Sequence, residues 1–262
     1  PRSIYLSSGF NSLRTAFGMA LYARRTGADL VTRPRVTTET GWVTGGAQGL
    51  AQEQQGRLSL NLCLAPCRQG FKYTFIHLLR DARGSDAGYG MFELTESVRF
   101  KSGIKLIGAG QDKTVLVYSG DRSDPFIKLT DCEEVEIAHL TLDGRGRPLG
   151  QDGIRAGNCR RLHLHHLTIR NLAKGKSSFV HGIIFSGHNP TMERGVTDGV
   201  ISDCRIENVG VGAAYGGGIR MAWGSGQNLV ERNVIRTTGR GGIFGDHSAE
   251  LVIRHNHVSG SG

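Results

Sequence analysis

A glycine-isoleucine pair recurs along the second half of the 262-residue chain and sets its period. The steps between successive isoleucines are 29, 36 and 24 residues, and Phe126-Ile127 occupies the same position 27 residues before the first pair. Repeats of this length, made of short strands and glycine turns without helical patterns, are typical of solenoids. The pairs are Gly153-Ile154, Gly182-Ile183, Gly218-Ile219 and Gly242-Ile243.

The second half of each unit aligns without gaps and predicts the interior of an all-β fold. Side chains alternate along a strand, and parallel strands stack about 4.8 Å apart, so equivalent aliphatic residues form ladders. Between the ladders, Asn233 and Asn256 predict amides that bond from rung to rung. The two expected inward ladders are Ile137, Leu164, Ile201, Val230, Ile253 and Leu142, Ile169, Ile206, Ile235, Val258.

With this pattern, residues 92–262 resemble the right-handed parallel β-helix superfamily, whose members include pectate lyases, polygalacturonases, alginate epimerases and phage tailspikes. The 39 glycines and the aromatic share of 7% suit its short strands and tight turns. A β-propeller would need units of about 40–50 residues with aromatic signatures, which are missing. The resemblance implies a right-handed β-helix solenoid but matches no specific family motif.

Residues 1–88 show no repeat and are taken as an N-terminal cap or irregular segment, distinct from the repeats at 89–262. Apolar residues at helical spacing predict a capping helix over 11–25, residues 32–57 are predicted to form loop, and 71–79 a strand. An alternative is that part of 1–88 does not belong to the fold, for example after a change of reading frame. The last unit lacks a polar cap, so we expect further rungs in the parent protein.

The net charge of +9 is unevenly distributed. Residues 1–88 contain 11 Lys and Arg against 5 Asp and Glu, whereas residues 89–262 contain 21 against 18. The repeats are therefore near charge balance and carry no recognition helix, so no nucleic-acid partner is expected. No apolar run approaches the roughly 18 residues of a membrane span. We expect a monomer, and the resemblance implies an extracellular or periplasmic location.

The strand after each Gly-Ile pair predicts a candidate site. With isoleucine inward, the next residue points outward, on the sheet that binds saccharides in pectate-lyase-like proteins. Arginine can pair with a uronate carboxylate, histidine can act as acid or base, and tryptophan offers a sugar ring a flat platform. We expect Arg220 to hold the substrate carboxylate, His181 to act as acid or base, and Asp246 to orient it or bind a metal. The expected substrate-binding residues are Asp152, Arg155, Trp223 and His247.

A structural role is the alternative for the same residues. Arg220 could pair with Asp246 across one rung, and Asp152 with Arg155. Ca²⁺ is a candidate cofactor, since it neutralises the substrate in many pectate-lyase-like enzymes. It needs six to eight oxygen ligands, however, and only the two aspartates are placed to supply them.

The resemblance and these residues together favour a carbohydrate-active protein whose partner is a polysaccharide. The leading interpretation is a lyase or epimerase-like enzyme on an acidic, uronate-containing polysaccharide. The alternatives are a glycoside hydrolase, which would need two carboxylates roughly 5–9.5 Å apart, and a non-catalytic glycan-binding or structural module. The paired aspartates of polygalacturonases, the alginate-epimerase signature and the arginine motif of pectate lyases are all missing.

Two further groups stand outside this face. The histidines of the His163-Leu-His-His166 segment are interpreted as solvated side chains, with a metal site open if carboxylates converge on them. Cys132 and Cys159 occupy equivalent positions one rung apart. Their spacing allows either a disulfide or two reduced thiols.

Overall fold

The computed structural model describes residues 35–37, 71–74 and 90–262. The chain divides into two compact units, residues 1–88 and 89–262. In the first unit, β1 (Arg35–Thr37) pairs in parallel with β2 (Phe71–Thr74). Strand β2 lies within the predicted strand, whereas β1 corrects the prediction of loop, because its residues find a partner distant in sequence. The predicted helix over 11–25 lies outside the described residues.

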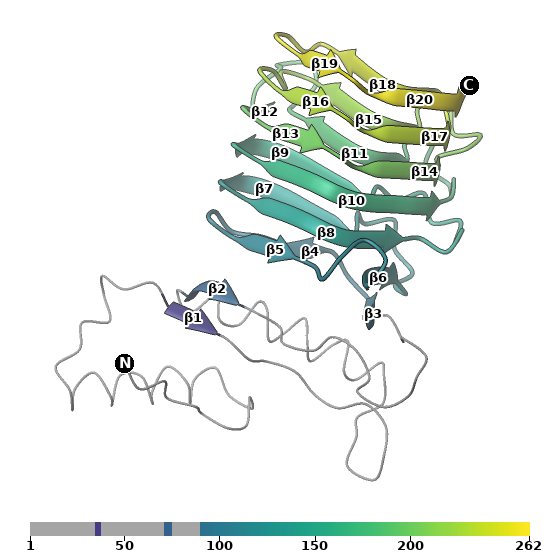
Figure 1. The fold of residues 1–262 in the computed structure, drawn as a ribbon. Coiled ribbons are helices and arrows are strands. Elements are labelled where there is room, and N and C mark those ends of the chain that lie inside the picture. Colours follow the sequence, from purple (N-terminus) through teal and green to yellow (C-terminus); the bar gives the residue numbers. More distant parts are fainter. Residues whose placement is uncertain (1–34, 38–70, 75–89) are drawn as a thin grey trace, which may run out of the picture. The chain divides into compact units, whose positions relative to one another are not determined.

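The second unit is a β-solenoid in which every strand pairing is parallel (Figure 1). One sheet has seven strands, which are β4 (Val98–Arg99), β7 (Ile127–Glu133), β9 (Ile154–Arg160), β11 (His181–Ser186), β12 (Val196–Thr197), β15 (Gly217–Ala222) and β18 (Gly241–Asp246). The other has eleven, which are β3 (Gly90–Leu94), β5 (Lys105–Ile107), β6 (Thr114–Tyr118), β8 (Glu136–Asp143), β10 (His163–Leu172), β13 (Val200–Ser202), β14 (Arg205–Val209), β16 (Leu229–Glu231), β17 (Val234–Thr238), β19 (Val252–Arg254) and β20 (His257–Ser261). The described residues contain no helix, and hence none long and apolar enough to cross a membrane.

The Gly-Ile pairs stack in register across the seven-stranded sheet, as predicted. Ile127, Ile154, Ile183 and Ile219 are direct neighbours in that order and are fully buried. The glycine is explained by close approach of the next rung. A Cβ on Gly153 would lie 2.5 Å from the carbonyl oxygen of the next glycine in the column, and the same collision recurs in later rungs. Only glycine therefore lets the rungs approach to hydrogen-bonding distance at this position.

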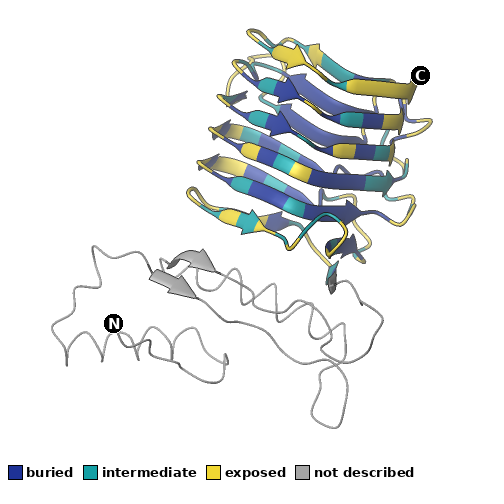
Figure 2. Ribbon diagram, in the orientation of Figure 1, coloured by how far each residue is buried: buried dark blue, intermediate teal, exposed yellow. Residues whose placement is uncertain are grey.

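The predicted ladders of the eleven-stranded sheet are also confirmed. Equivalent residues of both aliphatic columns pair directly from β8 through β20. Most of them are fully buried, which makes the interior of the solenoid the dark core in Figure 2. The last member of each ladder, Ile253 or Val258, is 47% or 44% exposed because it lies in the terminal described rung.

The asparagine ladder forms at the inner corner of three rungs. The Oδ1 of Asn233 accepts a bond of 3.0 Å from the backbone N–H of Cys204, and its Nδ2 donates to the carbonyl of Ile201. Asn256 repeats the arrangement one rung later by accepting from both the backbone and the Nδ2 of Asn233. Each amide thus satisfies backbone groups that the bend of the chain removes from the sheet.

Candidate site on the seven-stranded sheet

The register places the predicted outward residues in one row. Arg155, Ile184, Arg220 and Phe244 are successive neighbours across β9, β11, β15 and β18. The row is less open than expected, since Ile184 is 3% and Arg220 is 8% exposed. Neighbouring side chains cover them, so the candidate site is a largely closed layer of side chains over the sheet.

Arg220 and Asp246 form a bidentate ion pair across one rung. Nε of Arg220 lies 3.0 Å from Oδ1 of Asp246, and Nη2 lies 2.6 Å from Oδ2. The hydrogen bond from Arg220 lowers the pKa of Asp246 and so keeps the carboxylate ionised. The structural alternative for these two residues is therefore realised, while a catalytic role stays a prediction.

Aromatic rings surround the Arg220 guanidinium. Its Cζ lies 5.7 Å from the ring centre of Phe244 and 5.9 Å from that of Phe179, within the range of cation–π contact. Phe179 stacks on Tyr215 with ring centres 4.9 Å apart, and the Arg240 guanidinium lies over the Tyr215 ring at 5.9 Å. Phe179 and Tyr215 are 44% and 46% exposed, so they present an accessible aromatic surface.

Phe179 and Tyr215 were not among the predicted site residues. Each lies four residues before the isoleucine of its unit, Ile183 or Ile219. The Gly-Ile register could therefore have predicted this pair, since residues at the same distance before the isoleucine of successive units lie one above the other. The loops before the strands were not aligned by this register, and their aromatic pair was missed.

Asp152 and His181 form a buried pair at the start of β9 and β11. Oδ1 of Asp152 accepts from the backbone N–H of His181 at 2.8 Å and from its Nδ1 at 3.0 Å. Oδ2 accepts from Nε of Arg155 at 2.8 Å. Burial raises the pKa of Asp152, but the His181 hydrogen bond and the charge of Arg155 outweigh it, and the pKa is lowered overall.

His181, which we expect to act as acid or base, lies inside the fold. Its side chain is completely buried, and its Nε2 has no hydrogen-bond partner among the described residues. The nearest ring is that of Phe244, with centres 6.1 Å apart. A role as acid or base stays a prediction for this buried imidazole.

Trp223 and His247 stack at the opposite ends of β15 and β18. Their ring centres lie 4.1 Å apart with an interplanar angle of 13°. Both residues have positive φ, at 48° and 54°, which turns the chain out of the sheet and presents the rings together. This pair and the Phe179–Tyr215 pair thus flank Arg220 along the strand direction.

The carboxylates of this face do not form a metal centre. Asp152 and Asp246 are each engaged by an arginine. Among the residues that the structure describes, clusters of three potential metal ligands occur only on the eleven-stranded sheet. Either aspartate would have to give up its arginine to become a Ca²⁺ ligand.

A shallow depression of about 470 Å³ lies beside the ends of β7 and β9 and is lined in part by Cys132 and Cys159. Both thiols are free, with the two Sγ atoms 3.3 Å apart. The hydrogen bond between them raises the pKa of Cys132 and lowers that of Cys159. In this structure Cys132 and Cys159 are two reduced thiols on neighbouring rungs, one of the two arrangements that their spacing allows.

Comparison with known proteins connects this fold to a family. The family described as the right handed beta helix region matches residues 125–262. The pre-mature bacteriophage phi29 gene product 12 has a similar structure, with a TM-score of 0.55 and 18% identity over 66% of this chain and 25% of that chain. Geobacillus virus E2 ORF18 aligns with a TM-score of 0.34 and 11% identity over 66% of this chain and 53% of that one.

The two viral proteins are too distant to indicate more than a fold. The chain spans only a quarter of the length of the phi29 protein, and the similarity to the Geobacillus virus protein is too weak to support an argument. No curated protein matches the chain. The family match, however, covers more than half of the chain and coincides with the stacked rungs. The chain therefore belongs to the family of right-handed β-helix proteins.

Proposed function

We propose that the seven-stranded face binds an acidic polysaccharide. The observation that carries the proposal is the combination of exposed aromatic rings with arginines in one layer. Phe179 and Tyr215 offer flat apolar surface to sugar rings, and the exposed Arg240 lies over the Tyr215 ring. Arg155, on β9 of the same sheet, is 43% exposed. An extracellular or periplasmic location would bring the chain into contact with such polymers.

Arginine makes the face suited to a carboxylated sugar. Arg220 is 8% exposed, and Asp246 engages its Nε and Nη2, so a ligand carboxylate would reach Nη1 only after the covering side chains move aside. Arg240 is exposed and is held over the Tyr215 ring, so its charge is positioned at the edge of the aromatic surface. A neutral glycan would gain only from stacking on the aromatic rings, whereas a uronate polymer would gain from stacking and from pairing of its carboxylates with arginine.

Binding is tested by calorimetric titration with polygalacturonate and alginate, and with dextran as the neutral polymer. Phe179→Ala and Arg240→Ala should each weaken binding of the acidic polymers by about 10-fold, which corresponds to about 1.4 kcal/mol. Arg236→Ala, an exposed arginine on the eleven-stranded sheet, should leave binding unchanged. Equal affinity for dextran, or equal effects of Arg236→Ala and Arg240→Ala, would contradict the proposal.

A second candidate function is β-elimination on the bound polymer. A base removes the C5 proton of the uronate, the electron pair forms the C4–C5 double bond, and the C4–O bond breaks as the leaving oxygen gains a proton. This chemistry fits better than hydrolysis, which needs a carboxylic acid with a raised pKa. The pKa of both Asp152 and Asp246 is lowered.

The imidazole with access to solvent is that of His247, since His181 is buried. His247 is therefore our candidate base, with Arg220 neutralising the substrate carboxylate. Formation of the unsaturated product is followed by its ultraviolet absorbance. Product that disappears in His247→Ala while polymer binding persists would support elimination, and binding without any product would reduce the function to recognition.

A further inference from the structure

Four histidines gather on two neighbouring rungs of the eleven-stranded sheet, away from the proposed saccharide face. They lie on β8 and β10, which pair in parallel with Ala138 opposite His165. His139 and His166 follow these two residues and have positive φ values of 58° and 50°. Both therefore occupy the same corner of successive rungs, where the chain bends and projects a side chain outward.

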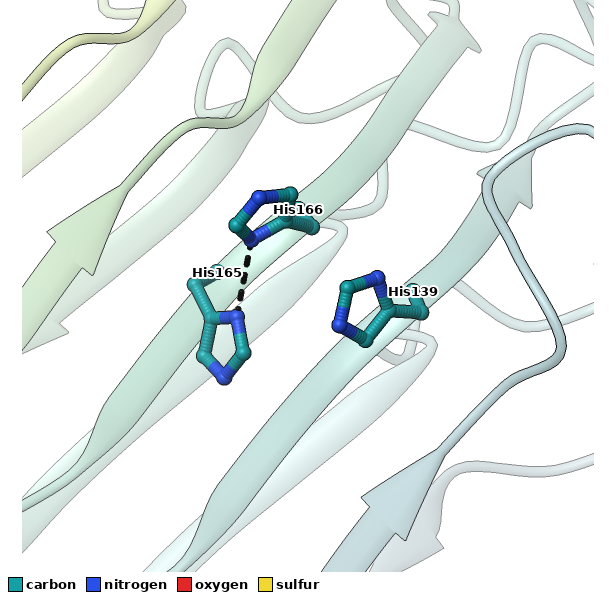
Figure 3. Close-up of side chains that lie close together, drawn as sticks. All are labelled: His139, His165 and His166. Carbon is teal, nitrogen blue, oxygen red and sulfur yellow. Dashed lines mark hydrogen bonds between the residues drawn. The ribbon is translucent and has the colours of Figure 1, made fainter.

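The three rings drawn in Figure 3 face a common space between the two strands. The ring centres of His139 and His166 are 4.8 Å apart, close to the rung spacing, and His165 lies edge-on to both. Nδ1 of His165 and Nδ1 of His166 are 2.9 Å apart. One ligand nitrogen from each of the three rings lies within 4.8 Å of the others.

Glu136 orients the central ring. Its Oε1 lies 3.2 Å from Nε2 of His165, while its Oε2 accepts from Lys105. The carboxylate therefore accepts the Nε2 proton of His165 in a hydrogen bond, which leaves the Nδ1 lone pair, 2.9 Å from Nδ1 of His166, to bind a metal. This carboxylate–histidine arrangement is the one that commonly supports a metal-bound imidazole.

We propose that His139, His165 and His166 form a binding site for a divalent transition-metal ion. Imidazole suits Zn²⁺, Ni²⁺ and Cu²⁺, whereas Mg²⁺ and Ca²⁺ prefer oxygen ligands. Zn–N bonds of about 2.0–2.1 Å in tetrahedral geometry place ligand nitrogens about 3.4 Å apart, so small side-chain rotations bring the three rings to bonding distance. His166 is exposed, which leaves the fourth position open to water or a ligand.

Two neighbouring side chains, His163 and Asp203, lie close to the proposed metal site but are not among its ligands. The ring centres of His163 and His165 lie 4.1 Å apart, but His163 clusters with Glu136 and His165 and not with His139 and His166. In the next rung, the corner position is taken by Asp203, whose carboxylate is held by two bonds from Arg232. We therefore assign neither His163 nor Asp203 as a ligand. The site lies on a different sheet from the proposed saccharide face and does not depend on that function.

The site is tested by calorimetric titration of the full chain, purified without a histidine tag, with ZnCl₂, NiCl₂ and MgCl₂. We expect Zn²⁺ and Ni²⁺ to bind with one ion per chain and Mg²⁺ not to bind. His139→Ala and His166→Ala should each weaken Zn²⁺ binding by more than about 10-fold. Glu136→Gln should weaken it by about 10-fold, the lower end of the effect of losing a carboxylate that hydrogen-bonds a metal-bound imidazole. Circular dichroism of the metal-free variants checks that each remains folded.

Control variants separate this site from nonspecific imidazole binding. His188→Ala, an exposed histidine beyond β11, should retain the affinity of the original chain. His163→Ala should retain it as well. Absence of Zn²⁺ binding, an equal loss in His188→Ala, or a loss in His163→Ala with full affinity in His139→Ala would each overturn the assignment.

Discussion

Replacing Asp152 with alanine should strongly destabilise the solenoid. The carboxylate is 3% exposed and connects two rungs by accepting three hydrogen bonds. Two of its donors, the backbone N–H and Nδ1 of His181, belong to a completely buried residue. In Asp152→Ala neither donor can turn to water, so both lose their partner.

The expected loss in the free energy of unfolding depends on how exposed the groups that donate to Asp152 are. An unsatisfied buried donor costs about 1–3 kcal/mol, so the two His181 donors together cost about 2–6 kcal/mol, with a central value of about 4. The Arg155 side chain is 43% exposed and can be solvated, so its share is only about 0–1 kcal/mol. Asp152→Asn keeps one oxygen acceptor for His181 and should cost about 2 kcal/mol.

Urea denaturation followed by circular dichroism measures these losses, with the denaturant slope compared to check that the same unit unfolds. Arg155→Ala is the matched control because it removes the ion pair from its exposed end. Our reasoning requires Asp152→Ala to be at least about 2 kcal/mol less stable than Arg155→Ala. Equal losses in the two variants would show that the ion pair, and not the buried hydrogen bonds to His181, stabilises this junction.

Three further predictions concern the core, acid and the thiols. Asn233→Ala should lower the free energy of unfolding in urea by about 3–5 kcal/mol. Three side-chain hydrogen bonds at about 1 kcal/mol each disappear, and buried backbone groups lose their partners; a loss below about 1 kcal/mol would contradict the proposed stabilising role of the asparagine ladder. The folded-state pKa of Asp152 is lowered, so its contribution to stability is complete above the unfolded pKa of about 3.9 and is lost as pH falls through the folded pKa. Between these conditions the free energy of unfolding, measured by urea denaturation, should fall less in Asp152→Asn than in the original chain; equal falls in the two proteins would refute this. Cys132 and Cys159 should form a disulfide with a thiol oxidant, because their sulfur atoms lie 3.3 Å apart. The number of titratable thiols per chain should then fall from five to three, and Cys132→Ser should prevent this loss; a thiol count that oxidation leaves unchanged would contradict the prediction.

The fold was predictable because its determinants repeat in the sequence. The spacing of Ile154, Ile183 and Ile219 reflects a fixed rung geometry, and the same register placed the inward ladders and Asn233 correctly. The strand β1 was missed because it pairs with residues more than 30 positions away, without a repeat to indicate the partner.

The candidate site was predictable only in part. The alternation of strand side chains correctly predicted that Arg220 and Phe244 are neighbours in one row across β15 and β18. It could not show that loops bring Phe179 over Arg220, or that the packing of later rungs buries His181. Periodicity describes the direction of a side chain from its own strand, whereas exposure depends on what other segments place above it.

The same distinction applies to the histidines of the eleven-stranded sheet. The solenoid, its register and the inward columns can be inferred from the amino-acid sequence, because each follows from a local pattern repeated at the rung period. The meeting of His139 with His165 and His166 is a property of the folded chain, since the rings meet through a bend at positive φ and across two rungs. Convergence of side chains depends on the path of the backbone between strands, and the strand pattern does not encode that path.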